Sequence, residues 1–358
     1  MNTTSYTVLG VMSGTSLDGV DLAYVKFSKN KEWQYEILQC ETVGYEALWI
    51  RRLRDAVHLS AEELKEVDEA YTHYLAAFIN DFLKRNPIKH LDAIASHGHT
   101  ILHQPHQGLT YQIGNMPLLA KLCSHLIICD FRVEDVKLGG QGAPLVPIGD
   151  KLLFANYGAC LNIGGFSNIS FDDNGKRIAY DICATNSVLN KLTSTLGFDY
   201  DKDGKLAASG KVNSGMLEVL NALSFYKKSF PKSLGLEWVN EKIIPILENS
   251  KLPIIDQIAT YTEHMAVQIA FVLKNCNSIS GSNEVLVTGG GAYNLYFMKR
   301  LELLSGLKIK RADPEIIEFK EALIFGFMGV LRLRNTINVL QSVTGASKDH
   351  CAGFVYSP

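Results

Sequence analysis

A short turn near the start of the chain carries the residue types that bind phosphate. It consists of Gly14, Thr15, Ser16, Leu17, Asp18 and Gly19, and it joins two apolar runs. Glycine allows a close backbone approach that a Cβ would hinder, and hydroxyls and amides can donate hydrogen bonds to phosphate oxygens. Asp18 offers a hard oxygen ligand for Mg²⁺, directly or through water. A simple β-hairpin turn favours the same residue types, so this turn alone leaves both interpretations open.

Two more glycine turns follow apolar runs further along the chain. Leu161–Ser170 repeats the pattern of strand, glycine turn and strand around Gly164 and Gly165. Glu284–Thr288 has the character of a buried strand, and it leads through Gly289, Gly290 and Gly291 into a helical stretch, Ala292–Leu304. A nucleotide can pack against bare backbone of this kind. The repetition predicts two related halves and favours a nucleotide site over three unrelated loops.

Asp181 is the leading candidate for acid–base chemistry. It follows a predicted strand, Arg177–Tyr180, and precedes a polar turn, Cys183–Asn186. A carboxylate at the end of a strand that faces a cleft is well placed to act as a general base. The alternative is an N-cap for the helical stretch Asn186–Leu196, a position that aspartate favours.

Other charged and imidazole side chains are candidates for substrate contacts. Asp130 and Arg132 could bind a polar substrate through charge-assisted hydrogen bonds or could form a structural ion pair. Glu321 could touch a ligand or simply begin a helix. A histidine cluster is formed by His97, His99, His103 and His106. Glycines and a proline interrupt this segment, so hydrogen bonds to substrate or to nearby backbone are favoured over a metal site.

Composition narrows the class of protein. The 358 residues exceed the usual size of one domain, which predicts two domains with a cleft between them. The formal charge of -2 gives no electrostatic reason to expect nucleic acid or an anionic membrane as a partner. No apolar run approaches the roughly 18 residues that span a bilayer, and the polar N-terminus does not resemble a secretion signal, so we expect a cytoplasmic protein. The seven scattered cysteines are typical of reduced core thiols, Cys183 included.

The elements that must position these residues follow an α/β pattern. Antiparallel strands are predicted at Thr7–Met12, Val20–Phe27 and Trp33–Val43, and short buried strands at Leu91–Ser96 and Leu126–Asp130. Ser60 and Glu63 form a capping box ahead of an amphipathic helix, in which Tyr71 and Tyr74 are expected in the core. Helices are predicted at Pro253–Asn275 and Phe319–Leu333. The segment Leu138–Pro144 is the best candidate for the crossing or hinge between domains.

The chain resembles the anhydro-N-acetylmuramic acid kinases, a branch of the superfamily of hexokinases, actin and the Hsp70 ATPase domain, over nearly its whole length. The motifs that carry the resemblance are Gly10–Asp21, His97–Gly98 with Thr100 and His103, Gln112–Gly114, Asp130–Arg132, Gly139–Pro147, Asn162–Gly165, Gly289–Gly291 and Ser342–Ala346. The resemblance implies a two-domain α/β fold of the actin-like ATPase (ribonuclease H-like) type, with a nucleotide cleft between the domains. The expected domains are residues 1–135 with 345–358, and residues 136–344.

The resemblance also implies a reaction and its participants. ATP and Mg²⁺ would be bound by Gly14–Gly19, Asp21, Gly164–Gly165 and Gly289–Gly291, with Asp18 at the metal. The sugar would be held by His97, Arg132, Asn186 and Glu321. Asp181 would activate water to open the 1,6-anhydro bridge of 1,6-anhydro-N-acetylmuramic acid, and O6 would take the γ-phosphoryl group. The product would be N-acetylmuramic acid 6-phosphate, made in cell-wall recycling. The resemblance also suggests a homodimer.

Three departures from the family pattern lie on the expected sugar side. The usual Asp-Thr-Gly-Pro-Gly-Asn turn is replaced by Asp181–Asn186, His99 stands in place of glutamine, and Leu234–Glu237 replaces a more polar segment. The alternatives are therefore a kinase for another anhydrosugar such as levoglucosan, or an Hsp70-like ATP-binding module. Arg132 discriminates between the sugars, because the lactyl carboxylate of muramic acid requires a cation.

Overall fold

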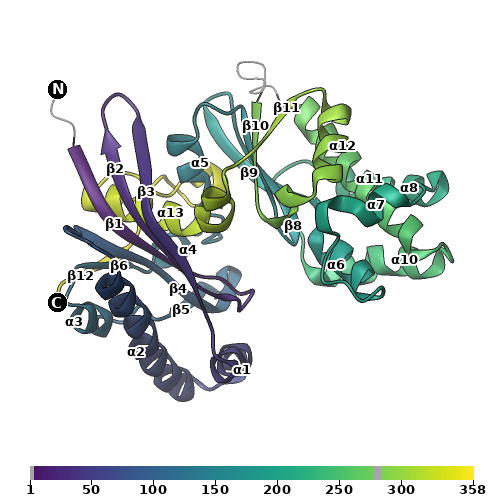
Figure 1. Ribbon diagram of the computed structural model, residues 1–358. Coiled ribbons are helices and arrows are strands. Elements are labelled where there is room, and N and C mark those ends of the chain that lie inside the picture. Colours follow the sequence, from purple (N-terminus) through teal and green to yellow (C-terminus); the bar gives the residue numbers. More distant parts are fainter. Residues whose placement is uncertain (1–3, 277–283) are drawn as a thin grey trace. The chain divides into compact units, whose positions relative to one another are not determined.

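The computed structural model describes residues 4–276 and 284–358, which form two compact units (Figure 1). Unit 1 comprises the chain up to Leu153 together with Phe319–Pro358, and unit 2 comprises Phe154–Glu318. Each unit has one mixed β-sheet with helices packed on it. The predicted α/β architecture in two units is therefore confirmed. No helix within the described ranges is both long and apolar enough to cross a bilayer.

The sheet of unit 1 confirms the predicted strands and extends them. Its order is β12 (Phe354–Tyr356), β6 (Ile127–Cys129), β4 (Ala93–Gln104), β1 (Thr4–Ser13), β2 (Gly19–Lys29) and β3 (Trp33–Gly44), with β5 (Leu109–Ile113) paired to β4. β1 is antiparallel to β2 and parallel to β4, and β4 is parallel to β6. The strand predicted to end at Ser96 continues to Gln104, because it pairs with β5 in a hairpin. The histidine segment is thus largely sheet.

Alternation along β1 divides the core of unit 1 into two faces, as the two-residue period of a strand requires. Leu9 and Val11 join the cluster that contains α1 (Ala47–Asp55) and α2 (Ala61–Arg85). Gly10 faces α13 (Pro314–Leu333), where a Cβ would lie 1.9 Å from the Ala322 carbonyl oxygen. The helix therefore packs directly on the strand backbone, and only glycine fits at this position.

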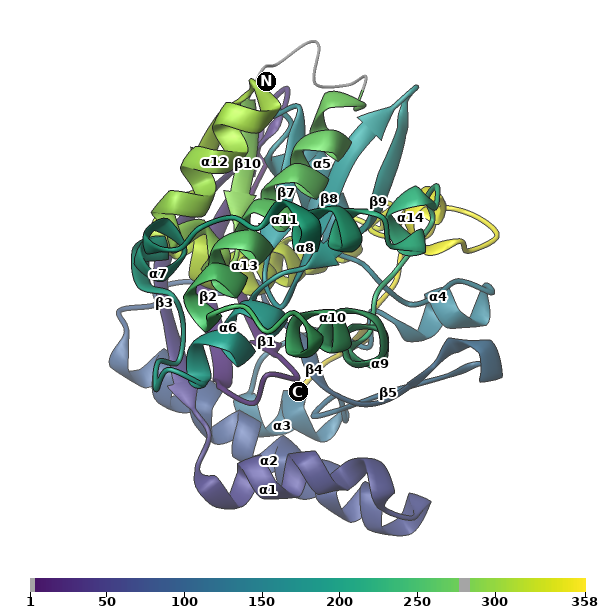
Figure 2. The ribbon, with the colours of Figure 1, turned by 90° about the vertical axis from the view of Figure 1, so that its right-hand side faces the viewer.

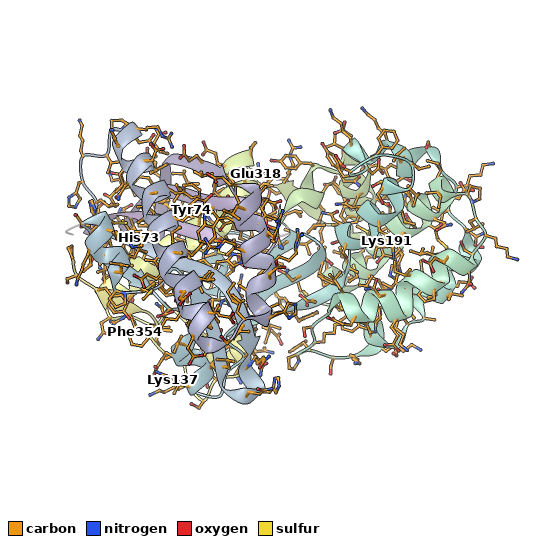
Figure 3. The ribbon with its side chains drawn as sticks, turned by 90° about the horizontal axis from the view of Figure 1, so that it is seen from below. His73, Tyr74, Lys137, Lys191, Glu318 and Phe354 are labelled. Carbon is orange, nitrogen blue, oxygen red and sulfur yellow. The ribbon has the colours of Figure 1, made fainter. Side chains whose placement is uncertain are left out.

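The predicted capping box of α2 is present, with Ser60 and Glu63 bonded to each other's backbone. Tyr71 is fully buried, as predicted. Tyr74, labelled in Figure 3, is only half-buried and stacks on Trp49 at a centroid distance of 4.7 Å. The remaining helices of unit 1 are α3 (Leu118–Cys123), α4 (Val133–Lys137), α5 (Pro147–Leu153) and α14 (Gln341–Thr344).

The sheet of unit 2 repeats the topology of unit 1. Its order is β9 (Lys176–Ala184), β8 (Phe166–Asp173), β7 (Ala159–Ile163), β10 (Glu284–Thr288) and β11 (Lys308–Arg311). Three antiparallel strands, β7 to β9, are followed by the parallel strands β10 and β11, just as β1 to β3 are followed by β4 and β6. The prediction of two related halves is confirmed.

A helical layer accompanies this second sheet (Figure 2). It contains α6 (Asn186–Ser194), α7 (Lys205–Ser209), α8 (Ser214–Asn221), α9 (Leu236–Trp238), α10 (Ile244–Asn249), α11 (Ile254–Lys274) and α12 (Leu295–Ser305). The predicted helix at 253–275 corresponds to α11, which packs against β9, α6, α7, α8 and α12. Helix α12 starts at Leu295 instead of Ala292, because residues 290–293 form a 3₁₀ turn and the Asn294 side chain caps the helix by accepting from Phe297 N at 2.9 Å.

The units divide at positions other than those expected from sequence, which were after residues 135 and 344. The segment Leu138–Pro144, predicted to be the crossing or hinge between domains, lies inside unit 1. The buried Asp135 carboxylate fixes it, accepting from Gly142 N at 2.6 Å and from Thr344 Oγ1 at 2.7 Å. The glycines of this segment permit a tight loop around a carboxylate. A glycine-rich sequence is the same for a fixed loop and for a hinge, so it does not distinguish them.

The cysteines behave as predicted in the described part of the chain, where they form no disulfide. Cys123, Cys129, Cys160, Cys183 and Cys276 are buried, and the other two are half-buried. Burial raises the pKa of Cys183 to about 12, so the thiolate that acts as a nucleophile is scarce near neutral pH. Cys183 is a core thiol.

Candidate functional site

The candidate phosphate loop of unit 1 connects β1 to β2, as predicted. Thr15 and Ser16 are exposed, and within the described residues their hydroxyl groups have no hydrogen-bond partner. The strained residue is Leu17, whose φ is 63°, and its amide donates to Gly14 O at 3.3 Å. Gly19 serves packing, since a Cβ would lie 2.4 Å from Val43 O. An exposed turn with unused donors suits an anion.

The residues at this loop fit a magnesium ion accompanied by phosphate. Asp18 is exposed, and Asp21 on β2 accepts from Thr42 Oγ1 at 2.6 Å. Residues 4–276 and 284–358 contain no group of three or more acidic, histidine or cysteine side chains arranged for a metal ion. Magnesium commonly takes only one or two carboxylates and completes its shell with phosphate oxygens and water. An exposed carboxylate such as Asp18 has the chemistry that such an ion would need from the protein.

His97 lies on β4, and Arg132 follows the parallel strand β6. Their side chains contact each other. Arg132 Nε donates to His97 Nε2 at 2.8 Å. Since Nε2 accepts, Nδ1 carries the proton and donates to Gly98 O at 2.9 Å. Burial, and then the Arg132 charge, hold the pKa of His97 well below its ordinary value. His97 is a neutral residue that orients Arg132.

Arg132 has one donor group left for a ligand. Its Nη1 donates to Gly142 O at 2.6 Å, while Nη2 contacts no acceptor among the described residues. Burial lowers the pKa of Arg132 to about 10, and Glu321 and Asp135 oppose that shift, so the side chain remains a cation at neutral pH. Glu321 is exposed and lies well inside α13, which starts at Pro314, so it does not begin the helix.

Asp130 does not pair with Arg132, and the described residues show no ion pair between them. Asp130 has a φ of 58°, and its carboxylate accepts from Asn115 Nδ2 at 2.9 Å. Burial raises the pKa of Asp130 to about 6. A half-buried carboxyl with a raised pKa is a further candidate for proton chemistry that sequence reasoning left unresolved.

A buried hydrogen-bond chain that the sequence did not reveal anchors the phosphate loop. Ser13 Oγ lies 2.7 Å from His99 Nδ1 and 2.5 Å from the Tyr45 hydroxyl, which lies 2.6 Å from the Tyr71 hydroxyl. Burial lowers the pKa of His99 to about 4 and raises that of Tyr45 to about 12, so the chain is uncharged at neutral pH. It fixes the residue immediately before the loop. The parallel register of β1 and β4, which pairs Ser13 with His99, is what brings these side chains together.

The other two histidines of the predicted cluster lie elsewhere on the β4–β5 hairpin. His103 Nδ1 lies 3.1 Å from Thr110 Oγ1, and His106 is an exposed residue of the short turn between the strands. The four imidazoles therefore have separate hydrogen-bonding environments. The predicted bond to nearby backbone is present for His97, whereas His99 and His103 bond to side chains.

In unit 2 the two glycine turns converge at one edge of the sheet. Because β7 and β10 are parallel, the turn at Gly164–Gly165 and the run Gly289–Gly291 leave the sheet side by side. A Cβ on Gly289 would lie 2.6 Å from Asn162 Oδ1, and one on Gly291 would lie 2.2 Å from Ile163 Cγ2. These glycines let the run Gly289–Gly291 pack on β7. The carboxyl ends of parallel strands are where open α/β sheets bind ligands.

Asn186 belongs to this glycine cluster. Its amide N–H donates to Gly164 O at 3.2 Å, and its Nδ2 would be 3.9 Å from a Cβ on Gly290. The preceding Thr185 clamps the same turn by donating from Oγ1 to Gly164 O at 2.8 Å. Gly164 and Gly165 themselves have no atom closer than 3.6 Å to a Cβ position, which leaves space over the turn. The sequence-predicted Gly164, Gly165, Asn186 and Gly289–Gly291 thus form one group.

Asp181 lies within β9, which continues to Ala184, so its predicted position at the end of the strand is wrong. It is not an N-cap either, because Thr185 occupies that position before α6. Its Oδ2 accepts from Leu234 N at 2.9 Å, and its N–H donates to Lys232 O at 3.2 Å. The described residues provide no cation within ion-pair distance, and burial raises the pKa of the Asp181 carboxyl. A raised pKa makes it a stronger base.

Two neighbouring glycines allow a matched test of the run Gly289–Gly291. Gly289→Ala meets both a φ of 78° and the Asn162 clash, so we expect a loss of about 1–3 kcal/mol in the free energy of unfolding. Gly290→Ala has an ordinary φ and no atom within 3.8 Å, so it should fold normally and instead raise the KM for ATP. Thermal unfolding and ATP-dependent rates of both variants measure this. Equal stability of the two variants would contradict the packing argument.

Comparison with known proteins identifies the family. The family model described as "Anhydro-N-acetylmuramic acid kinase" matches residues 6–358. Relatives of that name include one from Pseudomonas syringae pv. syringae, 34% identical over 97% of this chain and 98% of the relative, and one from Pseudomonas fluorescens, 36% identical over the same shares. Among solved structures, component A of (R)-2-hydroxyglutaryl-CoA dehydratase from Acidaminococcus fermentans aligns with a TM-score of 0.41 and 16% identity, covering 88% of this chain and 95% of that one. With a family model and relatives that span nearly all of its length, the chain belongs to the anhydro-N-acetylmuramic acid kinase family and is a kinase.

Proposed function

We propose that this kinase opens the 1,6-anhydro bridge of 1,6-anhydro-N-acetylmuramic acid with water and phosphorylates the released O6. The product is N-acetylmuramic acid 6-phosphate, an intermediate in the recycling of cell-wall fragments. The observation that supports this most directly is the Asp181 carboxylate. One of its oxygens is held by Leu234 N, the other is not hydrogen-bonded by the described residues, and no cation neutralises it. This is the state a general base requires.

In the proposed reaction the Asp181 carboxylate takes a proton from water as the water oxygen forms a bond to the anomeric carbon. The bond between that carbon and O6 breaks, and O6 takes the γ-phosphoryl group, with ADP as the leaving group. ATP with Mg²⁺ supplies the phosphoryl group and neutralises its charge. The chain's part in phosphoryl transfer is chiefly positioning. We assign that role to the Thr15 and Ser16 donors, with Asp18 as the metal ligand.

Arg132 is proposed to recognise the lactyl carboxylate of the sugar. Its Nη2 is available, and His97 and Gly142 fix the plane of the guanidinium through Nε and Nη1. A fixed, charged donor favours a carboxylate over a neutral hydroxyl. Asn186 and Glu321 are assigned to other polar groups of the sugar. A homodimer and a cytoplasmic location stay predictions.

The test is conversion of 1,6-anhydro-N-acetylmuramic acid with ATP in ¹⁸O-labelled water, with levoglucosan in parallel and mass spectrometry as the readout. We expect a product that has gained one phosphoryl group and one labelled oxygen. A phosphorylated product without label would exclude the coupled hydrolysis. Conversion of levoglucosan alone would support the other anhydrosugar as substrate, and ATP turnover that needs no sugar would remove the kinase proposal.

A further inference from the structure

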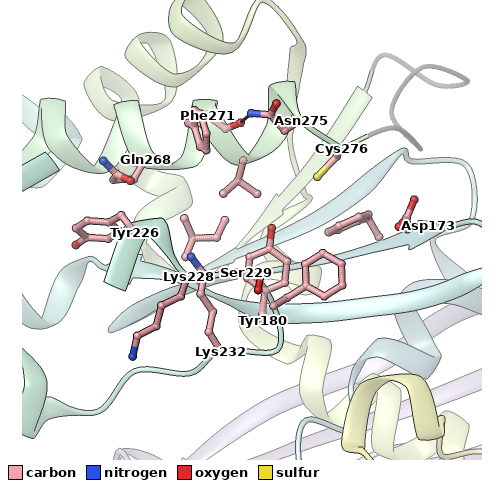
Figure 4. Close-up of a pocket in the computed structure, with 14 residues that line it drawn as sticks. Asp173, Tyr180, Tyr226, Lys228, Ser229, Lys232, Gln268, Phe271, Asn275 and Cys276 are labelled. Carbon is pink, nitrogen blue, oxygen red and sulfur yellow. Dashed lines mark hydrogen bonds between the residues drawn. The ribbon is translucent and has the colours of Figure 1, made fainter. Parts of the chain in front are cut away.

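A cavity in unit 2 has no part in the reaction proposed above. It has a volume of about 190 Å³ and lies between the β8–β9 hairpin, α11 and the segment 226–232 (Figure 4). Its apolar lining includes Phe171, Tyr180, Ile182, Phe271 and Val272. Phe271 is 62% exposed, which is unusual for a phenylalanine on a helix that otherwise packs against the sheet.

The volume of the cavity indicates the size of its occupant. An apolar protein cavity of about 150 Å³ is known to hold one benzene molecule. A cavity of about 190 Å³ therefore has room for one six-membered ring with a short substituent. Five aromatic and two branched side chains are among the fourteen that line the cavity, so an aromatic ring has apolar surface to pack against on more than one side.

Two lysines, Lys228 and Lys232, line this cavity. Lys232 is half-buried, and its Nζ lies 4.7 Å from the centre of the Phe225 ring and 5.7 Å from that of Tyr180. In the described part of the chain no carboxylate pairs with it, and burial lowers the pKa of its ammonium group. Lys228 also borders the cavity, but its ammonium group points away from the other lining side chains (Figure 4). The lining acid, Asp173, lies at the end of the cavity near Cys276, away from Lys232 (Figure 4), so Lys232 is the charged donor that a ligand in the cavity would meet.

Lys232 connects the cavity to the candidate general base. Its side chain borders the cavity, while its backbone oxygen accepts from Asp181 N at 3.2 Å. Two residues later, Leu234 N donates to the Asp181 carboxylate at 2.9 Å. A ligand that draws the Lys232 side chain toward itself acts on a segment that holds Asp181 by two hydrogen bonds.

We propose that this cavity binds a small aryl carboxylate, with the ring against Tyr180 and Phe271 and the carboxylate on Lys232, and that its occupancy changes the activity of Asp181 through residues 232–234. The coupling to activity rests on the proposed function of Asp181, whereas binding does not. The polar rim, Gln268 and the Tyr180 hydroxyl, can complete the carboxylate's hydrogen bonds.

Binding is tested on the whole protein without ATP or sugar, by calorimetry and ligand-observed NMR with phenylacetate as the probe. We expect phenylacetate to bind, the neutral phenylacetamide to bind at least about tenfold more weakly, and Lys232→Met to weaken phenylacetate by a similar factor. Lys228→Met is the matched control and should bind as the natural protein does. The comparison of the two probes needs no variant, so a folding defect in Lys232→Met leaves the test intact.

The coupling is tested by steady-state kinetics of the kinase with and without saturating phenylacetate. We expect a change in kcat that disappears in Lys232→Met and persists in Lys228→Met. Equal binding of the charged and neutral probes, or no binding of either, would overturn the site. Charge-dependent binding with unchanged kcat would overturn the coupling alone. Absence of any kinase activity with the natural protein would count against the proposed function and not against the site.

Discussion

Asp181→Asn should reduce kcat for 1,6-anhydro-N-acetylmuramic acid by about 10²–10⁴-fold, the range that a positioned general base contributes. The amide oxygen of asparagine can still accept from Leu234 N, so the segment 232–234 and the fold should be retained. What is lost is the carboxylate that takes the proton from water. The loss is measured as the rate of phosphorylated product, with thermal unfolding to verify the fold.

Asp203→Asn is the matched control for this substitution. Asp203 has a φ of 59°, which asparagine tolerates, and it forms only a surface ion pair with Lys205 at 3.4 Å. The control should keep the natural rate. If Asp181→Asn remained within a few-fold of that rate, Asp181 would not be the base, and Asp130, whose pKa burial raises to about 6, would be the next residue to test.

The same carboxylate sets the expected pH dependence. A base must be deprotonated to work, and burial raises the pKa of Asp181 above its ordinary value. The rate should therefore fall as the pH drops through this raised pKa, and the acid limb of the profile should lie at a higher pH than for an exposed aspartate. In Asp181→Asn the residual rate should lose this limb.

Arg132→Met should lower kcat/KM for 1,6-anhydro-N-acetylmuramic acid by about 10²–10³-fold, because the variant removes the cation that meets the lactyl carboxylate in a partly dry site. Levoglucosan has no carboxylate, so any turnover of that sugar should change little. Arg132→Lys should fail almost as severely. A single ammonium group cannot hold His97 and Gly142 O and also meet the ligand, as the three nitrogens of the guanidinium can.

The two sugars separate recognition from folding. A structural role for Arg132 predicts equal losses on both substrates together with a lower unfolding temperature. Recognition predicts a loss restricted to the carboxylated sugar at nearly constant unfolding temperature. Kinetics on both sugars and a melting curve for each variant distinguish these cases.

Local signals were sufficient for much of the fold. The hairpins β1–β2 and β7–β8 were predictable because β-branched runs end at glycine turns, and the start of α2 because Ser60 and Glu63 satisfy each other's backbone. The failure at Leu138–Pro144 has an equally physical cause. The partners that turn this segment into a fixed loop, Asp135 and Thr344, lie outside it, and Thr344 is distant in sequence.

The candidate site also has parts that the sequence predicted and parts that it did not. Residue types alone pointed to Thr15, Ser16 and the glycine turns, because phosphate needs donors and close backbone approach. The contact of Ser13 with His99 depends on the pairing of β1 with β4, and the hold of Leu234 on Asp181 joins residues 53 positions apart. No periodicity or spacing encodes such pairs, so sequence reasoning identified Asp181 but misplaced it on its strand.

The packing of α13 on Gly10 has a consequence for the order in which the protein can form during synthesis. Unit 2 is one continuous stretch, Phe154–Glu318, whereas unit 1 needs Phe319–Pro358 to cover one face of its sheet. As the chain leaves the ribosome, the strands of unit 1 are synthesised before α13, which covers one face of their sheet. Apolar residues such as Val8 and Phe27 remain uncovered until α13 is available. The first half to be translated is therefore the last to mature, and this interval is when the nascent chain most needs protection from aggregation.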